Sequence, residues 1–263
     1  MAAKEKKKKP HKPRSLSHGR PMTAKKPTAS LSSKATRTLI RTHHQLEKAR
    51  AKALKEGDEK AVKAIEAQQT KQGGLKSYQQ ASITGQSLTR GGDSSKVLLE
   101  WLSSTGVLSD SKIRATQSLK VLEVGALSPS NAVSLNSRFE VTRIDLHSQH
   151  PSIETQDFMA RPLPASDNEK FDIISLSLVL NYVPDAEGRG EMLKRTCQFL
   201  RTTSGERTAQ KSTLPSLFLV LPAPCVTNSR YVTEERLTAM MESLGYSRTH
   251  RKLSDKLVYY LWE

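Results

Sequence analysis

Two residues in the second half of the chain have the types and the spacing of a nucleoside-binding site. Gly125 follows the short apolar stretch 119–124, and Asp145, which ends the stretch 139–145, lies 20 residues after it. A glycine after a first strand lets the backbone approach a ligand closely, and an acid after the next strand can accept hydrogen bonds from both hydroxyls of a ribose. Either residue alone also fits a plain turn or a strand-end cap, so the hypothesis depends on their order and spacing.

A second acid and an aromatic residue extend this site. Asp157 and Phe158 follow a third short stretch, where an acid can bond an adenine amino group while an aromatic ring packs on the base. The loop after Gly125 has no second or third glycine, and a pyrophosphate needs that closer approach together with free amides at a helix N-terminus. NAD and FAD are therefore disfavoured. S-adenosyl-L-methionine, which has a ribose and an adenine but no phosphate, is the expected cofactor.

Candidate substrate-binding residues follow the next two apolar stretches. Asn181 is expected to bond the edge of a base and Tyr182 to stack on it; the alternative is a plain turn that leads into a helix with Asp185 as its N-cap. Arg230 is a candidate phosphate contact, and a solvated arginine is the alternative. These assignments rest on position alone.

Strand-like and helix-like stretches alternate through this half of the chain and predict the scaffold. Strands are expected at 119–124, 139–145, 152–157, 171–177 and 217–221, and helices at 189–200 and 234–244. The stretch 246–262 predicts two strands joined at Ser254 and Asp255, which must be antiparallel because the joint is so short. The expected fold class is α/β: a Rossmann-like, mostly parallel sheet with a C-terminal antiparallel hairpin. Ligands of such sheets bind beyond the carboxyl ends of the strands, where the candidate residues lie.

The N-terminal part differs in composition. Residues 1–50 hold fifteen of the 42 Lys and Arg of the chain but two of its 26 Asp and Glu. The run Lys6, Lys7, Lys8 and Lys9, followed by scattered basic residues and prolines, predicts a disordered polybasic arm. Such an arm can bind RNA phosphates or act as a nuclear address, and the alternative is a tail that keeps the protein soluble.

Helix-forming residues follow the arm. A turn at Gly57 and Asp58 divides them into two expected helices, and the polar, glycine-rich segment 73–96 is expected to be a linker or a lid over the substrate. The expected organisation is an arm over 1–32, a helical and lid-like region over 33–95, and a cofactor-binding domain over 96–263.

Composition also excludes several classes of protein. The mean hydropathy is −0.55 and no apolar run approaches the roughly 20 residues of a membrane span, so no membrane association is expected. Two cysteines, Cys197 and Cys225, have no CxxC or Cys/His spacing, so neither a disulfide framework nor a metal site is expected. A reducing, intracellular compartment follows, and the oligomeric state is left open.

Several unusual strings resemble the fungal Bmt2 family of 25S ribosomal RNA adenine-N(1) methyltransferases. They are Val121–Ser128, Arg143–His147, Gln156–Pro164, Ile174–Pro184, Leu219–Tyr231 and Gly73–Lys96. The resemblance implies a class I, Rossmann-like methyltransferase that modifies N1 of an adenine in large-subunit ribosomal RNA or a pre-ribosomal particle, in the nucleolus of the nucleus. By matching motif it implies cofactor contacts at Gly125 and Asp145, and by position at Asp157 and Phe158.

Two other functions fit the same pattern of Gly125 and Asp145. One is a non-catalytic S-adenosylmethionine sensor that acts through a protein partner, which animal relatives of the family resemble. The other is a methyltransferase that acts on a protein or a small molecule. The basic arm favours RNA, because a sensor has no use for such a dense positive charge.

Overall fold

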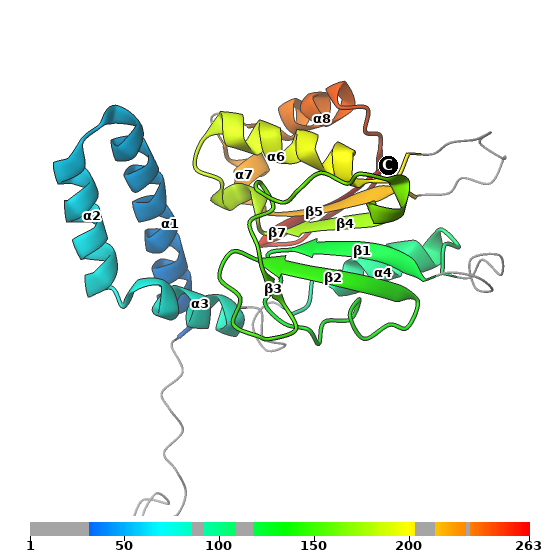
Figure 1. Ribbon diagram of the computed structural model, residues 1–263, viewed down its shortest axis with the longest axis horizontal. Helices are drawn as coiled ribbons and strands as arrows, with labels where there is room; N and C mark the ends of the chain where they lie inside the picture. The colour runs from blue at the N-terminus through cyan, green and yellow to red at the C-terminus, as the bar shows by residue number, and fades with distance from the viewer. Residues whose placement is uncertain (1–31, 86–91, 109–117, 203–213, 230–231) are drawn as a thin grey trace, which may run out of the picture.

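The computed structural model describes residues 32–85, 92–108, 118–202, 214–229 and 232–263 (Figure 1). The expected polybasic arm, with Lys6, Lys7, Lys8 and Lys9, lies outside the described residues, and so does Arg230. Among the helices that the structure describes, none is long and apolar enough to cross a membrane.

A seven-stranded sheet forms the centre of the molecule, in the order β3-β2-β1-β4-β5-β7-β6. Its strands are β1 Leu119–Val124, β2 Phe139–Asp145, β3 Glu154–Thr155, β4 Ile173–Ser177, β5 Ser216–Pro222, β6 Arg248–Leu253 and β7 Leu257–Trp262. The first five run parallel, while β7 is antiparallel to both β5 and β6. The predicted α/β sheet with its C-terminal hairpin is confirmed. The third strand is shorter than expected, because both its residues are exposed and it pairs with the last two residues of β2.

Helices cover both faces of the central strands. α6 (Ala186–Phe199) and α8 (Glu234–Ser243) pack on the face that carries Leu122, Ile174 and Leu219, and α4 (Ser95–Ser104) packs on the other face. Figure 1 shows α6 and α8 above the sheet and α4 partly behind β1 and β2. The residues of β4 and β5 are buried almost throughout because they are covered on both sides, which explains their unbroken apolar sequence.

Three of the four connections between successive parallel strands contain no α-helix, and the one from β2 to β3, residues 146–153, is a short stretch of turns. The connection from β1 to β2, residues 125–138, is built of turns, and the connection from β3 to β4, residues 156–172, holds a single 3-10 turn, η2 (Asp167–Glu169). Two short elements follow the ends of β4 and β5: η3 (Leu180–Tyr182) and α7 (Pro224–Thr227). The carboxyl ends of the first strands are therefore bordered by loops.

The N-terminal region consists of α1 (Ser33–Glu56), α2 (Glu59–Lys71) and α3 (Gly74–Gly85). The predicted turn is confirmed: Gly57 ends α1 with a φ of 72°, and the Asp58 side chain accepts the Ala61 amide at the start of α2. The expectation of an irregular segment after Gly73 was wrong for residues 74–85, which form α3 and pack on α1.

Candidate functional site

The glycine at the end of β1 is required by its surroundings. Gly125 has a φ of 75°, and a Cβ atom there would lie 2.5 Å from Cγ2 of Val179, which follows β4. Its amide and that of Ala126 both donate to the Ile144 carbonyl, at 2.8 and 3.1 Å. The loops that leave β1 and β4 therefore approach each other at Gly125 more closely than a side chain would permit.

Asp145 lies at the end of β2, half-buried, next to the loop of Gly125. Its Oδ1 accepts the His147 amide at 2.8 Å, and within the described part of the chain Oδ2 has no hydrogen-bond partner. The Gln79 side chain of α3 donates to the His147 carbonyl at 2.8 Å. The loop after β2 is thus held from two sides, while one carboxylate oxygen stays available to a ligand.

The two residues expected to hold an adenine lie in different environments. Asp157 is exposed, and its Oδ1 accepts the Met159 amide at 2.8 Å. Phe158 is only 2% exposed, and its ring packs on Phe199, with the ring centroids 5.3 Å apart, and below the guanidinium of Arg195. The expectation that the Phe158 ring packs on a ligand is therefore corrected, since that ring belongs to the core between sheet and α6. β3 has only two residues, so the sequence showed no alternation of apolar and polar residues from which the direction of the Phe158 side chain could be predicted.

Asn181 and Tyr182 lie together in η3, beyond the end of β4. The Tyr182 ring stacks on His44 of α1 with 3.7 Å between the centroids, and Tyr78 of α3 meets it edge-on. Burial raises the pKa of Tyr182, so its hydroxyl stays protonated. Oδ1 of Asn181 is buried and has no hydrogen-bond partner among the described residues. Asp185 caps α6 by accepting the Gly188 amide at 2.7 Å, so the turn expected as the alternative is present as well.

His44 is neutral in this cluster. Burial, followed by the charges of His43 and Lys48, lowers its pKa to about 3. The neighbouring His43 stacks on Tyr78, with 4.2 Å between the centroids. The helices α1 and α3 therefore bring a cluster of aromatic rings to the ends of the central strands, which the sequence did not predict.

A buried acid that sequence reasoning passed over lies two residues before Gly125. Glu123 is the one charged side chain among the last four residues of β1, and its Oε1 accepts the Asn131 side-chain amide at 2.6 Å. Oε2 is buried without a partner among the described residues. Burial raises the pKa of Glu123 to about 7, although Asn131 and Arg143 oppose the increase. An acid inside an apolar strand was the signal that could have identified it.

Residues 93–95 tie the start of α4 to the loop after Gly125. The Asp93 carboxylate accepts the Ser95 amide at 2.9 Å and the Ala132 amide at 2.5 Å. The Ser94 and Ser177 hydroxyls lie 2.8 Å apart, which joins the same segment to the end of β4. These contacts give the polar segment a positioning role: it fixes the loops around the strand ends.

The raised pKa of Glu123 predicts a pH dependence of stability. Its pKa in the folded protein, about 7, lies above the reference value of 4.5, so the unfolded chain releases the proton first. Stability should therefore fall as the pH rises from 4.5 to 7, by about 3 kcal/mol for this residue. Because Gln cannot ionise, we expect Glu123→Gln to be more stable than wild type at pH 8 and of similar stability at pH 4.5. Urea unfolding at both pH values measures this, and a difference independent of pH would contradict it.

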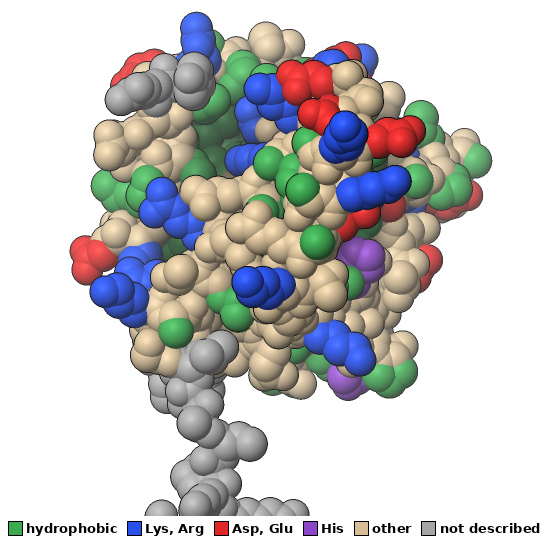
Figure 2. All heavy atoms as spheres, turned by 90° about the vertical axis from the view of Figure 1, so that its left-hand side faces the viewer, with side chains coloured by type: hydrophobic (Ala, Val, Ile, Leu, Met, Phe, Trp, Pro, Cys, Tyr) green, Lys and Arg blue, Asp and Glu red, His purple; other side chains and the backbone are tan. Residues whose placement is uncertain are grey.

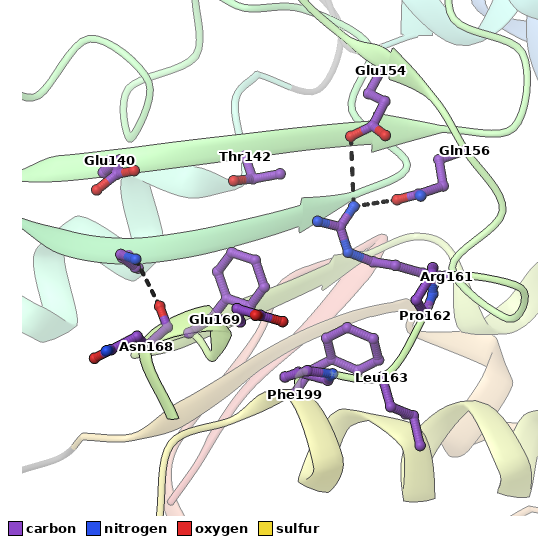
Figure 3. A pocket seen from close by; sticks show the side chains of 13 residues that line it. Glu140, Thr142, Glu154, Gln156, Arg161, Pro162, Leu163, Asn168, Glu169 and Phe199 are labelled. Carbon is purple, nitrogen blue, oxygen red and sulfur yellow. Dashed lines mark hydrogen bonds and ion pairs between the residues drawn. The ribbon is translucent and has the colours of Figure 1, made fainter. Parts of the chain in front are cut away.

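A separate hollow opens on the face of β1 and β2 (Figure 3). Its volume is about 410 Å³, and it exists because the crossover from β3 to β4 has no α-helix to cover this part of the sheet. Arg161 pairs with Glu154 at 3.5 Å and donates to Gln156, and the Lys120 ammonium donates to the Asn168 carbonyl at 2.8 Å. None of the predicted site residues lines this hollow, so it is distinct from the strand-end site.

The strand-end site suits a polar ligand of moderate size. Among the buried atoms without a partner in the described residues are two acceptors of the candidate site residues, Oε2 of Glu123 and Oδ1 of Asn181, and unpaired buried acceptors are costly unless a ligand satisfies them. Gly125 lets the loops after β1 and β4 approach each other closely, and Asp145 adds a charged acceptor. Within the described residues no group of three His, Cys, Asp or Glu side chains is arranged to hold a metal ion.

Residues 63–263 match the family model described as "25S rRNA (adenine(2142)-N(1))-methyltransferase, Bmt2". A relative from Schizosaccharomyces pombe, named 25S rRNA adenine-N(1) methyltransferase, is 40% identical over 226 residues, which cover 85% of this chain and 79% of the relative. One from Saccharomyces cerevisiae, named 25S rRNA (adenine(2142)-N(1))-methyltransferase, is 40% identical over 194 residues, or 73% of this chain and about half (52%) of the relative.

Solved structures also resemble the chain, at low identity. N-methyltransferase NodS from Bradyrhizobium japonicum, in complex with S-adenosyl-L-homocysteine, has a TM-score of 0.39 and 16% identity, and the match covers 61% of this chain and 85% of that one. An O-methyltransferase family protein from Burkholderia thailandensis has a TM-score of 0.43 and 9% identity, covering 89% and 73%.

Proposed function

The chain belongs to the Bmt2 family of 25S rRNA adenine-N(1) methyltransferases, and we propose that it transfers a methyl group from S-adenosyl-L-methionine to N1 of an adenine in large-subunit ribosomal RNA. The observation that carries this proposal is the family match, which runs from α2 to the end of the chain and includes every described residue of the strand-end site on the sheet. The unpaired acceptors at that site suit the proposed cofactor.

Four residues would hold the cofactor. Asp145 accepts hydrogen bonds from the two ribose hydroxyls, and Gly125 allows the backbone to approach the ligand. Oε2 of Glu123 suits the cofactor's ammonium group, whose positive charge would also favour the ionised acid. Asp157 remains the candidate partner of the adenine amino group, while the Phe158 ring is left out because it is buried in the core.

The residues of η3 would align the target base. The cofactor, when bound, supplies an electrophilic methyl group on a sulfonium. N1 of adenine attacks through its lone pair, so no general base is needed, and the task of the protein is alignment and exclusion of water. Oδ1 of Asn181 can accept a hydrogen bond from the exocyclic amine of the base, which orients N1 and stabilises the positive charge that the ring gains.

Tyr182 can stack on a base only if its present neighbour moves or if the opposite ring face is used. His44 covers one face of the ring at 3.7 Å. Because His44 is neutral, it is bound there by stacking rather than by charge, and an extruded adenine offers a larger aromatic surface to the same face. We therefore assign Tyr182 to base stacking and His44 to holding its ring in place beforehand.

A ribosomal RNA substrate implies work in the nucleus, and in the nucleolus in particular, where large-subunit RNA is assembled. The polybasic segment at residues 4–26 fits both RNA delivery and a nuclear address.

The decisive experiment maps N1-methyladenosine in large-subunit RNA by reverse-transcription stops, in the source organism with and without the gene. We expect one stop to disappear on deletion, to return with the wild-type gene and to stay absent with Asp145→Ala, because that carboxylate holds the cofactor. An unchanged pattern of stops in the deletion strain would contradict the proposal and would favour the S-adenosylmethionine sensor.

A further inference from the structure

The helix α1 carries a row of basic side chains along one side. Six exposed residues form this basic stripe: Lys34, Arg37, Arg41, Lys48, Lys52 and Lys55. At 100° per residue they all fall within an arc of about 60°, over a length of about 32 Å. Such a regular spacing places six positive charges on one continuous line of the surface.

The stripe weakens the helix that bears it. Four pairs within it are three or four residues apart, and like charges at that spacing repel each other and destabilise a helix. One ion pair of the stripe occurs among the described residues, Lys52 with Glu56 at 3.7 Å, and both side chains are exposed. The charge is therefore largely uncompensated, and an anionic ligand would relieve the repulsion.

Two further acids of the helices have partners away from the stripe. Glu66 of α2 pairs with Arg50 at 2.8 Å, and Glu47 accepts the Gln69 side chain at 2.6 Å, both in the interface between α1 and α2. Residues 33–85 hold eleven Lys and Arg against five Asp and Glu, whereas residues 92–263 hold twenty of each. The excess charge beyond the arm thus belongs to the helices rather than to the sheet.

The stripe runs beside the strand-end site. Figure 1 shows α1 next to the end of the sheet toward which β1 and β2 point. His44, which lies between Arg41 and Lys48 along α1, stacks on Tyr182. The Lys48 charge counteracts the burial that raises the pKa of Cys225 after β5. The pKa of Asp185, which follows β4, is lowered mainly by the hydrogen bond from the Gly188 amide, and the charge of Lys55 lowers it further.

The surface around α1 carries basic side chains rather than a continuous apolar patch. Figure 2 looks onto the side of the molecule that carries α1 and α2, where Lys and Arg side chains are spread over the face and Asp and Glu gather at its upper right. A helix that binds a membrane needs an exposed apolar face. Leu46 and Ala53 of α1 are buried within the molecule, and among the large hydrophobic residues of α1 only Leu54 is exposed, which is too little for an apolar membrane-binding face.

We propose that the basic stripe of α1 binds the phosphate backbone of the RNA strand that carries the target adenine, and so delivers that base to η3. The inference rests on the proposed function, because it concerns the substrate of the same site. A line of spaced cations fits a line of phosphates, each contact releasing condensed counterions. The stripe positions the strand and does not read its sequence, since backbone contacts carry no base information.

Two matched triple variants of the full-length protein test this surface. The stripe variant is Arg41→Gln, Lys48→Gln and Lys55→Gln; the control is Lys60→Gln, Lys63→Gln and Lys71→Gln on α2, where all three side chains are exposed. Both lower the net charge by the same amount and keep the arm. The probe is an unmodified transcript of the large-subunit RNA, and affinity is measured against salt concentration. Cofactor binding by calorimetry checks that both variants are folded.

We expect the stripe variant to bind the transcript at least tenfold more weakly, with a salt slope smaller by about 2, because each lost phosphate contact removes about 0.7 from the slope. The control should stay within about twofold of wild type, and both should bind S-adenosyl-L-methionine normally. Equal losses in the two variants, or none in either, would overturn the proposal, as would stripe-dependent binding to phosphatidylserine vesicles without any effect on RNA.

Lysine acetylation read by mass spectrometry locates the contact independently of the arm. With the transcript bound, Lys48, Lys52 and Lys55 should be protected while Lys60 and Lys63 stay reactive; equal reactivity of both groups would contradict the proposal. Methylation of the transcript is assayed in parallel. If wild type binds RNA through the stripe yet never methylates it, the proposed function is contradicted while the RNA-binding surface is supported. If wild type methylates the transcript and neither binding nor methylation depends on the stripe, the proposed function is supported and the stripe proposal is contradicted.

Discussion

Replacing Asp145 by alanine is expected to abolish measurable binding of S-adenosyl-L-methionine. In the proposed site this carboxylate would accept hydrogen bonds from two ribose hydroxyls, and hydrogen bonds to a charged group contribute about 1.5–3 kcal/mol each. Losing both lowers affinity by roughly a hundredfold to ten-thousandfold. Isothermal titration calorimetry on the purified protein measures the change.

The structure supplies a control for this variant. Asp255 is an exposed acid in the turn between β6 and β7, and Asp255→Ala should bind the cofactor as wild type does. Asp145→Ala also loses the bond from the His147 amide at 2.8 Å, so its unfolding must be measured beside its affinity. A folded Asp145→Ala protein that keeps micromolar affinity would contradict the assignment of this residue.

The sheet and the positions of Gly125 and Asp145 at neighbouring strand ends were predictable because their signals are local. Unbroken apolar runs follow from burial on both faces, as in β4 and β5, and chain order then places Gly125 and Asp145 at adjacent strand ends. The Phe158 ring was assigned wrongly, because β3 has only two residues and its neighbours follow no alternation that fixes their direction.

Contacts between distant segments could not be read from the sequence. The stacking of His44 on Tyr182 joins residues 138 positions apart, and the side-chain bond from Gln79 to the His147 carbonyl spans 68. Neither pair has a spacing pattern, because each depends on how α1 and α3 pack against the sheet. The distribution of charge also depends on the folded helix. The excess of positive charge over residues 1–50 was assigned to the arm, yet part of it lies on α1, where helix geometry aligns the basic side chains in a stripe.

Gly125→Ala is expected to destabilise the protein by about 2–4 kcal/mol and to weaken cofactor binding. A positive φ costs an alanine about 1 kcal/mol, and overpacking in a closed space costs about 1–3 kcal/mol more. The added methyl would lie 2.5 Å from Cγ2 of Val179, which must move and would displace η3 with it. Urea unfolding and calorimetry measure the two effects.

Gly57→Ala separates backbone strain from crowding. Gly57 has nearly the same φ, 72°, but a Cβ there meets no atom within 4 Å, so this variant should lose only about 1 kcal/mol and bind the cofactor normally. Val179→Ala removes the clashing methyl, so the double variant Gly125→Ala/Val179→Ala should be more stable than the sum of the single losses by about 1–2 kcal/mol. Strict additivity would mean that the close approach of the loops after β1 and β4 does not constrain Gly125, and that backbone conformation alone requires the glycine.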